Sequence, residues 1–175
     1  MMGGKGEKGW DPATKAFMEA LRLLEDVPML SGLMRHAHVM RNRSMPYPPG
    51  KWAFGTSNGE IFIHPTRRAE PTEWVYIIAH CLLHLGFDHF REHEHFNLWN
   101  VACDCFIARF LFHLKLGKPP VEMAGAVSFA AGSEEALYRE FAAQGVPSEL
   151  QVFSTAGAGH NDLILEPAKK RYFGG

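Results

Sequence analysis

The spacing of apolar residues predicts an amphipathic helix near the start of the chain. Asp11-Pro12 is typical of a helix start, because Asp can accept hydrogen bonds from free backbone N–H groups and Pro suits the first helical position. Apolar residues then recur at i, i+3, i+4 and i+7, at Phe17, Ala20, Leu21 and Leu24. We expect this helix to end at Val27-Pro28.

The pattern changes to short apolar runs in the next part of the chain, which predicts a β-hairpin. WAFGT (residues 52–56) and EIFIHP (residues 60–65) flank Ser57-Asn58-Gly59. Asn-Gly favours the positive φ angles that a tight turn needs.

Three further helices are predicted downstream, each followed by a glycine that can end it. They span residues 74–85, 97–116 and 134–144, and the glycines are Gly86, Gly117 and Gly145. The segment after residue 150 has little periodicity. We therefore assign residues 1–150 to a single domain and residues 151–175 to a linker or tail.

The composition is that of an ordinary globular protein, with 175 residues, of which 46% are hydrophobic and 21% charged. A net charge of −1 gives no electrostatic case for binding nucleic acid or an anionic membrane. Three cysteines argue against a disulfide framework, and the N-terminus lacks the apolar run of a signal peptide. The apolar runs are too short and too interrupted to span a bilayer. We expect a cytoplasmic protein.

The chain is unusually rich in histidine, and its central stretch suggests a metal site. His80 and His84 lie four residues apart on a predicted helix, so two imidazoles can face one ion, as in helix-borne zinc sites. Gly86 would let the chain turn and bring His89 back as a third imidazole. Asp104 lies among apolar residues of the next helix, where a carboxylate needs a partner such as a metal or an Arg. His89 and Asp104 therefore compete as the third ligand of one zinc or similar divalent ion. Two histidines packed in a core remain the alternative.

Several motifs together resemble the metallopeptidase domain that is often found ahead of a von Willebrand factor A-like domain. The similarity covers roughly residues 50–145 and rests on GTSNGEIFIHP, EWVYIIAHCLLHLGFDHFR, LWNVACDCFIA and SEEALYREF. By position, His80, His84 and His89 match the three histidines of the family motif, and Asp104 matches the Asp of its Trp-Asn-x-Ala-x-Asp segment. The resemblance implies a zincin-like α+β fold, with a small, mostly antiparallel sheet packed on an active-site helix and a second long helix. It also implies a protein partner, such as a von Willebrand factor A-like domain or an associated ATPase.

The sequence departs from this family at the position that matters most for hydrolysis. Cys81 stands where the family has the Glu that acts as general base, and Ala108 or Arg109 stands where the family tends to have Asn. Loss of a general base typically lowers the rate by about 10²–10⁴-fold. A metal-binding domain with impaired or lost hydrolysis is therefore the leading interpretation.

Two catalytic alternatives remain open at this stage. The first is an active hydrolase with a substitute base, such as Glu73, Glu92 or Glu94. The second is a nucleophile built from Cys81 and a neighbouring His, which would need a lowered thiol pKa.

The domain can bind a peptide whether hydrolysis is retained or lost, because strand addition uses only backbone groups. We expect residues 60–65 to form a sheet edge that binds an extended peptide. Ile61 and Ile63 would then face inward, and Glu60 and Phe62 outward.

Overall fold

The structure is a computed structural model that describes residues 11–47, 50–121, 123, 132–152, 155–156 and 160–165. Within these residues the chain forms five α-helices and one four-stranded sheet, so the α+β class is as predicted. The elements in chain order are α1 (Pro12–Glu25), α2 (Pro28–His36), β1 (His38–Met40), β2 (Ala53–Thr56), β3 (Glu60–Ile63), α3 (Pro71–Gly86), α4 (Phe96–Leu114), α5 (Glu134–Gln144), a 3-10 helix (Ser148–Val152) and β4 (Leu163–Ile164).

The predicted helices form close to their expected bounds. Asp11 caps α1, and its side chain accepts hydrogen bonds from the backbone N–H groups of Ala13 and Thr14. At the start of α3 the backbone N–H of Glu70 donates to the carboxylate of Glu73 at 3.2 Å. The sequence pattern did not predict α2 and β1, which are only 9 and 3 residues long. Elements this short carry too few periods to stand out.

The sheet is mixed, which corrects the expectation of a mostly antiparallel one. Strands run in the order β1-β3-β2-β4. The predicted hairpin gives the antiparallel pair β2–β3, whereas β1 pairs with β3 in parallel and β4 pairs with β2 in parallel. The two outer strands come from distant parts of the chain, so hairpin signals in the sequence could not predict them.

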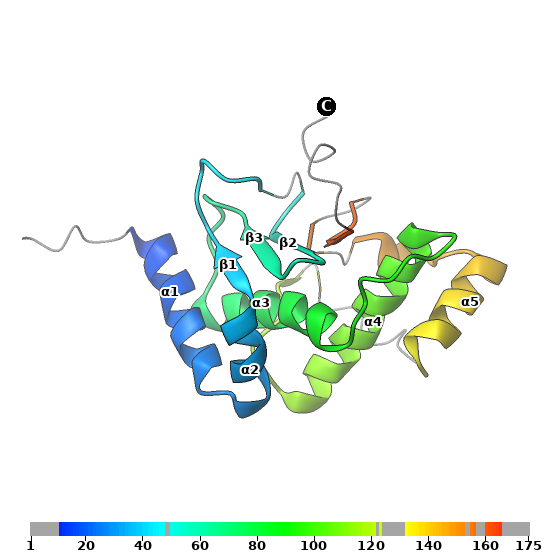
Figure 1. Ribbon diagram of the computed structural model, residues 1–175, viewed down its shortest axis with the longest axis horizontal. Helices are drawn as coiled ribbons and strands as arrows, with labels where there is room; N and C mark the ends of the chain where they lie inside the picture. The colour runs from blue at the N-terminus through cyan, green and yellow to red at the C-terminus, as the bar shows by residue number, and fades with distance from the viewer. Residues whose placement is uncertain are drawn as a thin grey trace, which may run out of the picture.

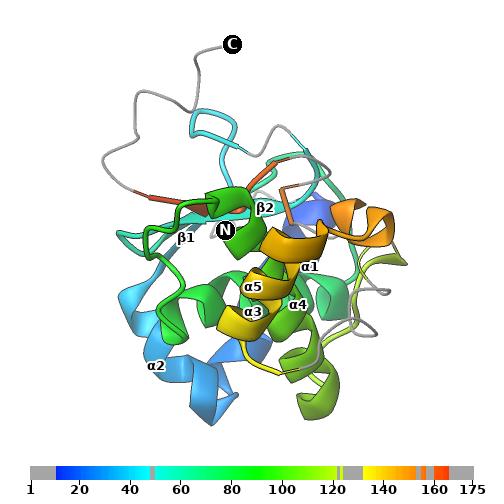
Figure 2. The same cartoon turned by 90° about the vertical axis from the view of Figure 1, so that its right-hand side faces the viewer.

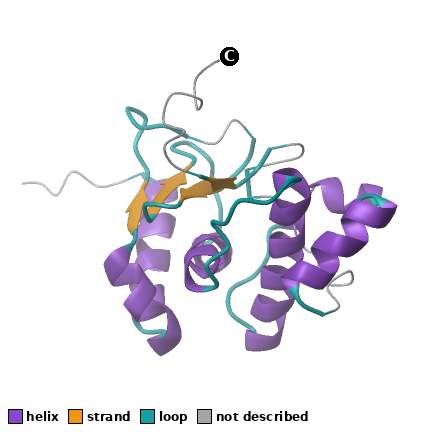
Figure 3. Cartoon of the chain, turned by 45° about the vertical axis from the view of Figure 1, so that its right-hand side comes forward, coloured by secondary structure: helices purple, strands orange, loops and turns teal. Residues whose placement is uncertain are grey.

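The sheet covers one side of α3, with α1 and α2 at one flank and α4 and α5 at the other (Figures 1 and 3). Figure 2 shows α5 in front of α4, against which it packs. Ile61 and Ile63 face α3 and join the main core with Trp74 and Ile77. α3 is therefore enclosed, and its residues from Trp74 to His84 are all buried.

The other face of the sheet is also covered. Phe62 points away from α3, as expected, but it is buried against Phe54 and Ala156. β3 lies between β1 and β2, so residues 60–63 do not form the sheet edge that the sequence suggested. The edges of the described sheet are β1 and β4.

Part of the segment assigned to a linker or tail belongs to the folded domain. β4 pairs with β2 through Gly55 and Leu163, and Thr155 and Asp162 are completely buried. The strand is too short to have been recognised from its sequence. No helix in the described part of the chain is long and apolar enough to cross a membrane.

Candidate metal centre

Four side chains from three separate segments meet at one buried point beside α3. His80 and His84 lie on one face of α3, and Asp104 lies on α4. Asp162 directly precedes β4. One ligand atom from each residue lies within 4.8 Å of all the others. The exposed fractions are 1%, 1%, 3% and 0%, so the group is closed to solvent.

The distances within this group are close to those of a tetrahedral zinc site, and most are shorter. Nε2 of His80 lies 3.0 Å from Nε2 of His84, 3.1 Å from Oδ1 of Asp104 and 2.9 Å from Oδ2 of Asp162. Nε2 of His84 lies 3.1 Å from the same Asp104 oxygen and 3.6 Å from the same Asp162 oxygen. A tetrahedron with ligands about 2.0–2.2 Å from a central ion has edges of about 3.3–3.6 Å. Four of these five distances are shorter than the edges of that tetrahedron, so the four ligand atoms would move slightly apart around a zinc ion.

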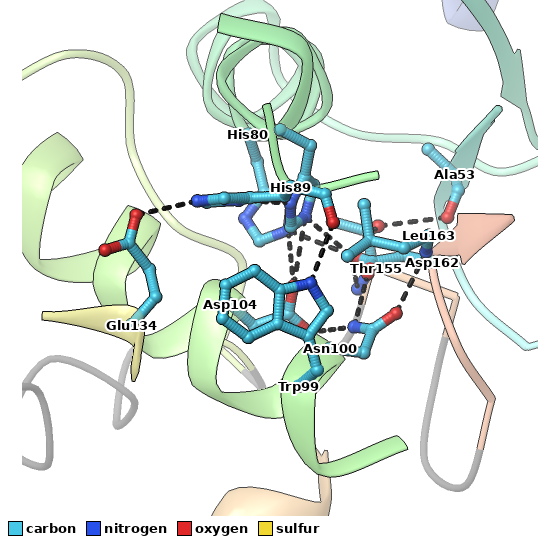
Figure 4. Close-up of polar contacts among 11 residues, drawn as sticks. Ala53, His80, His89, Trp99, Asn100, Asp104, Glu134, Thr155, Asp162 and Leu163 are labelled. Atoms are coloured by element: carbon cyan, nitrogen blue, oxygen red, sulfur yellow. Dashed lines mark hydrogen bonds and ion pairs between the residues drawn. The ribbon is translucent and has the colours of Figure 1, made fainter. Parts of the chain in front are cut away.

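Asn100 and Thr155 hold the two carboxylates in place (Figure 4). The Asn100 amide donates to Asp104 at 3.1 Å and to Asp162 at 2.7 Å, and its oxygen accepts the Leu163 N–H at 3.0 Å. The Thr155 hydroxyl lies 2.8 Å from Asp162 and 3.0 Å from the carbonyl oxygen of Ala53. One amide thus joins α4 to β4 and orients both acidic residues.

The two buried carboxylates need positive charge or a proton, since burial and the charge of Asp162 raise the pKa of Asp104, and the described residues bring them only imidazoles as basic partners. Burial opposes protonation of His80, but hydrogen bonds to Asp104 and Asp162 outweigh it and raise its pKa to about 10. The pKa of His84 is also raised, because the charge of Asp162 and hydrogen bonds to both carboxylates overcome burial. The pKa of Asp162 is held well below its usual value, despite burial, by the two histidines. Imidazolium protons or one divalent cation would equally satisfy this demand for positive charge.

The donor set itself suits a divalent ion such as Zn²⁺. Two imidazole nitrogens and two carboxylate oxygens are ordinary zinc ligands. With neutral imidazoles the four groups carry two negative charges, which one divalent ion neutralises. His80, His84, Asp104 and Asp162 therefore fit the metal that the sequence predicts, although no sequence pattern had pointed to Asp162.

His89 lies next to this group but not within it. The backbone turns at Asp88, which has a φ of 54°, and the His89 N–H donates to the carbonyl oxygen of His84 at 3.0 Å. Nδ1 of His89 lies 3.0 Å from Nδ1 of His84, and its Nε2 lies 2.8 Å from the carboxylate of Glu134. Of the two competing candidates for the third ligand, the structure thus brings Asp104 to the centre and turns His89 toward α5. Gly86 ends α3, as predicted, but Asp88 makes the turn.

Cys81 is buried and takes no part in the convergent group. Its side chain forms a hydrogen bond with Thr155, and it is 1% exposed. Burial, followed by the charge of Asp162, raises the pKa of this thiol well above its usual value. A neutral thiol is a poor proton acceptor and a poor nucleophile, which is the opposite of what either catalytic role requires.

The candidate substitute bases lie away from the convergent group. Glu73 is in the first turn of α3, about 10 Å along the helix axis from His80 at 1.5 Å per residue. Glu92 and Glu94 are exposed in the loop before α4. None of the three belongs to the group of ligand atoms that converge.

Sequence reasoning therefore found three of the four convergent residues and missed Asp162. The nearest signal is an acidic residue directly before the apolar triplet Leu163-Ile164-Leu165, but three residues are too few to identify a strand. The glycines that precede it favoured a linker instead. The role of Asn100 as a bridge between the two carboxylates depends on the position of β4, so it could not be predicted either.

Comparisons with protein-family models, with curated proteins and with solved structures each found no match to this chain.

Proposed function

We propose that this chain is a zincin-like metal-binding domain, related to metallopeptidases, in which hydrolysis is impaired or lost. The observation that carries the proposal is the convergence of His80, His84, Asp104 and Asp162 on one buried point, with their ligand atoms all within 4.8 Å of one another. The ion would be one Zn²⁺ or a similar divalent cation. The likeness to metallopeptidases rests on the sequence motifs alone.

The number of protein ligands favours a structural centre over a catalytic one. Catalytic zinc sites keep one position open for water or substrate, whereas structural sites use four protein ligands. Here four protein atoms surround the point, and none of the four residues is more than 3% exposed. A polypeptide substrate would have no route to this point unless an element moved.

Position 81 gives a second, independent reason for weak or absent hydrolysis. A general base must accept a proton near neutral pH, and the raised pKa of Cys81 keeps its thiol protonated. Its hydrogen bond to Thr155 also directs it toward a residue that supports Asp162. The same facts disfavour a cysteine nucleophile.

The centre would stabilise the fold by tying distant segments together. Asp104 and Asp162 follow His80 by 24 and 82 residues. A metal that binds only the folded chain stabilises it by about 2.7 kcal/mol at 100 times its Kd. For a domain of this size that is about 5–11 °C in Tm, which chelation should remove.

A protein partner is part of the proposal, because the family resemblance implies one. It would be a von Willebrand factor A-like domain, an associated ATPase or an extended peptide. Since residues 60–63 lie inside the sheet, β1 and β4 are the edges to which a peptide strand could be added.

The test is the metal content of the full chain, purified without chelators and measured by native mass spectrometry and elemental analysis. The wild type should carry one divalent ion, and the His80→Ala/His84→Ala variant should carry none. His36→Ala/His38→Ala is the matched control, because both side chains are exposed. It should bind as the wild type does.

The same samples distinguish the catalytic alternatives. Incubation with an unfolded protein substrate should give no proteolysis that chelation abolishes. Chelator-sensitive proteolysis by the wild type, absent from the His80→Ala/His84→Ala variant, would establish an active hydrolase and refute the proposal.

A further inference from the structure

We propose that Glu134 and His89 are positioning residues for the metal centre, and that they orient the imidazole of His84 through a chain of two hydrogen bonds. We call His84, His89 and Glu134 the imidazole chain. The inference rests on the proposed metal-binding function and extends it to α5, an element that supplies no ligand.

The direction of the two hydrogen bonds follows from the chemistry of the partners. A carboxylate only accepts, so the hydrogen between Glu134 and His89 is on Nε2 of His89, at 2.8 Å. The two Nδ1 atoms of His89 and His84 lie 3.0 Å apart, which leaves room for one hydrogen between them. When Nε2 of His84 offers its lone pair to a metal, the hydrogen of that ring must be on Nδ1. His84 therefore donates to His89, and His89 donates to Glu134.

This arrangement selects the form of His84 that can bind metal at Nε2. A ligating histidine commonly donates its other N–H to a carboxylate, a carbonyl or water, which fixes the ring and the position of its hydrogen. Here a second imidazole stands between the ligand and the carboxylate. His80 has no equivalent support, because its Nδ1 is buried without a hydrogen-bond partner in the described part of the chain. We infer that packing orients His80, whereas the imidazole chain orients His84.

The surroundings hold the middle member of the imidazole chain in place. His89 is completely buried, and its backbone N–H donates to the backbone carbonyl oxygen of His84. Its backbone carbonyl oxygen accepts a hydrogen bond from the indole N–H of Trp99 at 2.8 Å. Phe87 stacks on its ring. Figure 4 shows the ring of His89 directed toward the carboxylate of Glu134. Its ring therefore has little freedom to turn, and Glu134 fixes which nitrogen carries the hydrogen.

The neighbouring residue on α5 provides a matched control. The carboxylate of Glu135 lies 3.2 Å from Nε2 of His93, so it is also paired with a histidine. That pair is more exposed, with the side chains of His93 and Glu135 13% and 48% exposed, and neither residue belongs to the group of convergent ligand atoms. Glu134→Ala and Glu135→Ala thus remove the same charge from the same turn of α5, but only the first breaks the imidazole chain.

The experiment measures Zn²⁺ affinity of the full chain by competition with a chromophoric chelator. Glu134→Ala should weaken binding by about 10–100-fold, as for other residues that support a metal ligand. Glu134→Gln should recover much of the affinity, because its amide oxygen can accept the same hydrogen bond. Glu135→Ala should bind as the wild type does. Circular dichroism and melting curves identify a variant that fails to fold, in which case the imidazole shifts of the wild type carry the test.

Imidazole ¹⁵N chemical shifts provide a readout that general destabilisation would not move. In the wild type His89 should carry its hydrogen on Nε2 and His84 on Nδ1. Glu134→Ala should remove this preference at His89 and leave His80 unchanged, whereas Glu134→Gln should retain it.

Three results would overturn the inference, and they differ in what else they refute. If wild type binds Zn²⁺ and Glu134→Ala binds it equally well, or if His89 carries its hydrogen on Nδ1, the imidazole chain does not position His84. If wild type binds no Zn²⁺, the proposed function fails and the inference fails with it.

Discussion

The bridge made by Asn100 gives the sharpest prediction about the centre itself. Asn100→Asp changes one atom group and keeps the size of the side chain. It replaces the amide nitrogen, which donates to Asp104 at 3.1 Å and to Asp162 at 2.7 Å, with an oxygen that cannot donate. It also adds a third carboxylate to two that are already buried, since Asn100 is 1% exposed.

The size of the loss in unfolding free energy follows from the two hydrogen bonds that are lost. Hydrogen bonds to charged groups contribute about 1.5–3 kcal/mol each, so the variant should lose about 3–6 kcal/mol of unfolding free energy. Protonation of a carboxylate would relieve part of the added repulsion, so the lower end is the safer expectation. With a urea m-value of about 1–3 kcal/mol/M, a loss of 3 kcal/mol lowers the unfolding midpoint by about 1–3 M.

The assay is urea unfolding followed by circular dichroism, with equal Zn²⁺ in all samples. Asn97→Asp is the control, because it makes the same change on the same helix at an exposed residue that pairs only with Asn161 among the described residues. Its unfolding free energy should change by less than about 0.5 kcal/mol, as for most surface substitutions. If Asn100→Asp unfolds at the same urea concentration as Asn97→Asp, the amide does not hold the carboxylates, and the reasoning is refuted.

Two further predictions follow from burial and backbone geometry. Cys81, Cys103 and Cys105 are all buried, and their thiol pKa values are raised. Iodoacetamide should therefore leave the native protein unlabelled and modify all three thiols after unfolding, as read by mass spectrometry. Rapid labelling of Cys81 in the native protein would reinstate the cysteine nucleophile. Gly117 has a φ of 67°, and a Cβ there would lie 2.7 Å from the backbone nitrogen of Tyr76, so Gly117→Ala should cost at least about 1–3 kcal/mol in a thermal melt. Gly32→Ala, in open space within α2, should instead stabilise by about 0.5–1 kcal/mol, and equal effects of the two substitutions would contradict the account.

The sequence predicted the parts of the fold that depend on local chemistry. The cap at Asp11 and the hairpin turn at Ser57–Gly59 each act within a few residues of their own position, and their elements form where the pattern placed them. The predicted stop at Gly117 is displaced, because α4 ends at Leu114 and Lys115 caps it in the left-handed conformation. The pairings of β1 and β4 depend on contacts between distant segments, and a strand of two or three residues has no detectable period.

The candidate site divides along the same line. His80 and His84 share a helix face, so their spacing alone predicts that they meet. Asp104 was found because a carboxylate among apolar residues needs a partner. Asp162 reaches the site only through the pairing of β4 with β2, which the sequence could not show. The imidazole of His89 was a candidate ligand because Gly86 permits a turn. The turn at Asp88 directs this ring toward Glu134 instead.

The most direct test of the central claim is anomalous X-ray diffraction from crystals of the full chain grown with Zn²⁺, with data on both sides of the zinc absorption edge. We expect one strong anomalous peak, about 2.0–2.2 Å from Nε2 of His80, Nε2 of His84 and one oxygen each of Asp104 and Asp162, with no solvent ligand. A peak with His89 in place of either aspartate, a coordinated water in an open position, or no peak among these residues would contradict it.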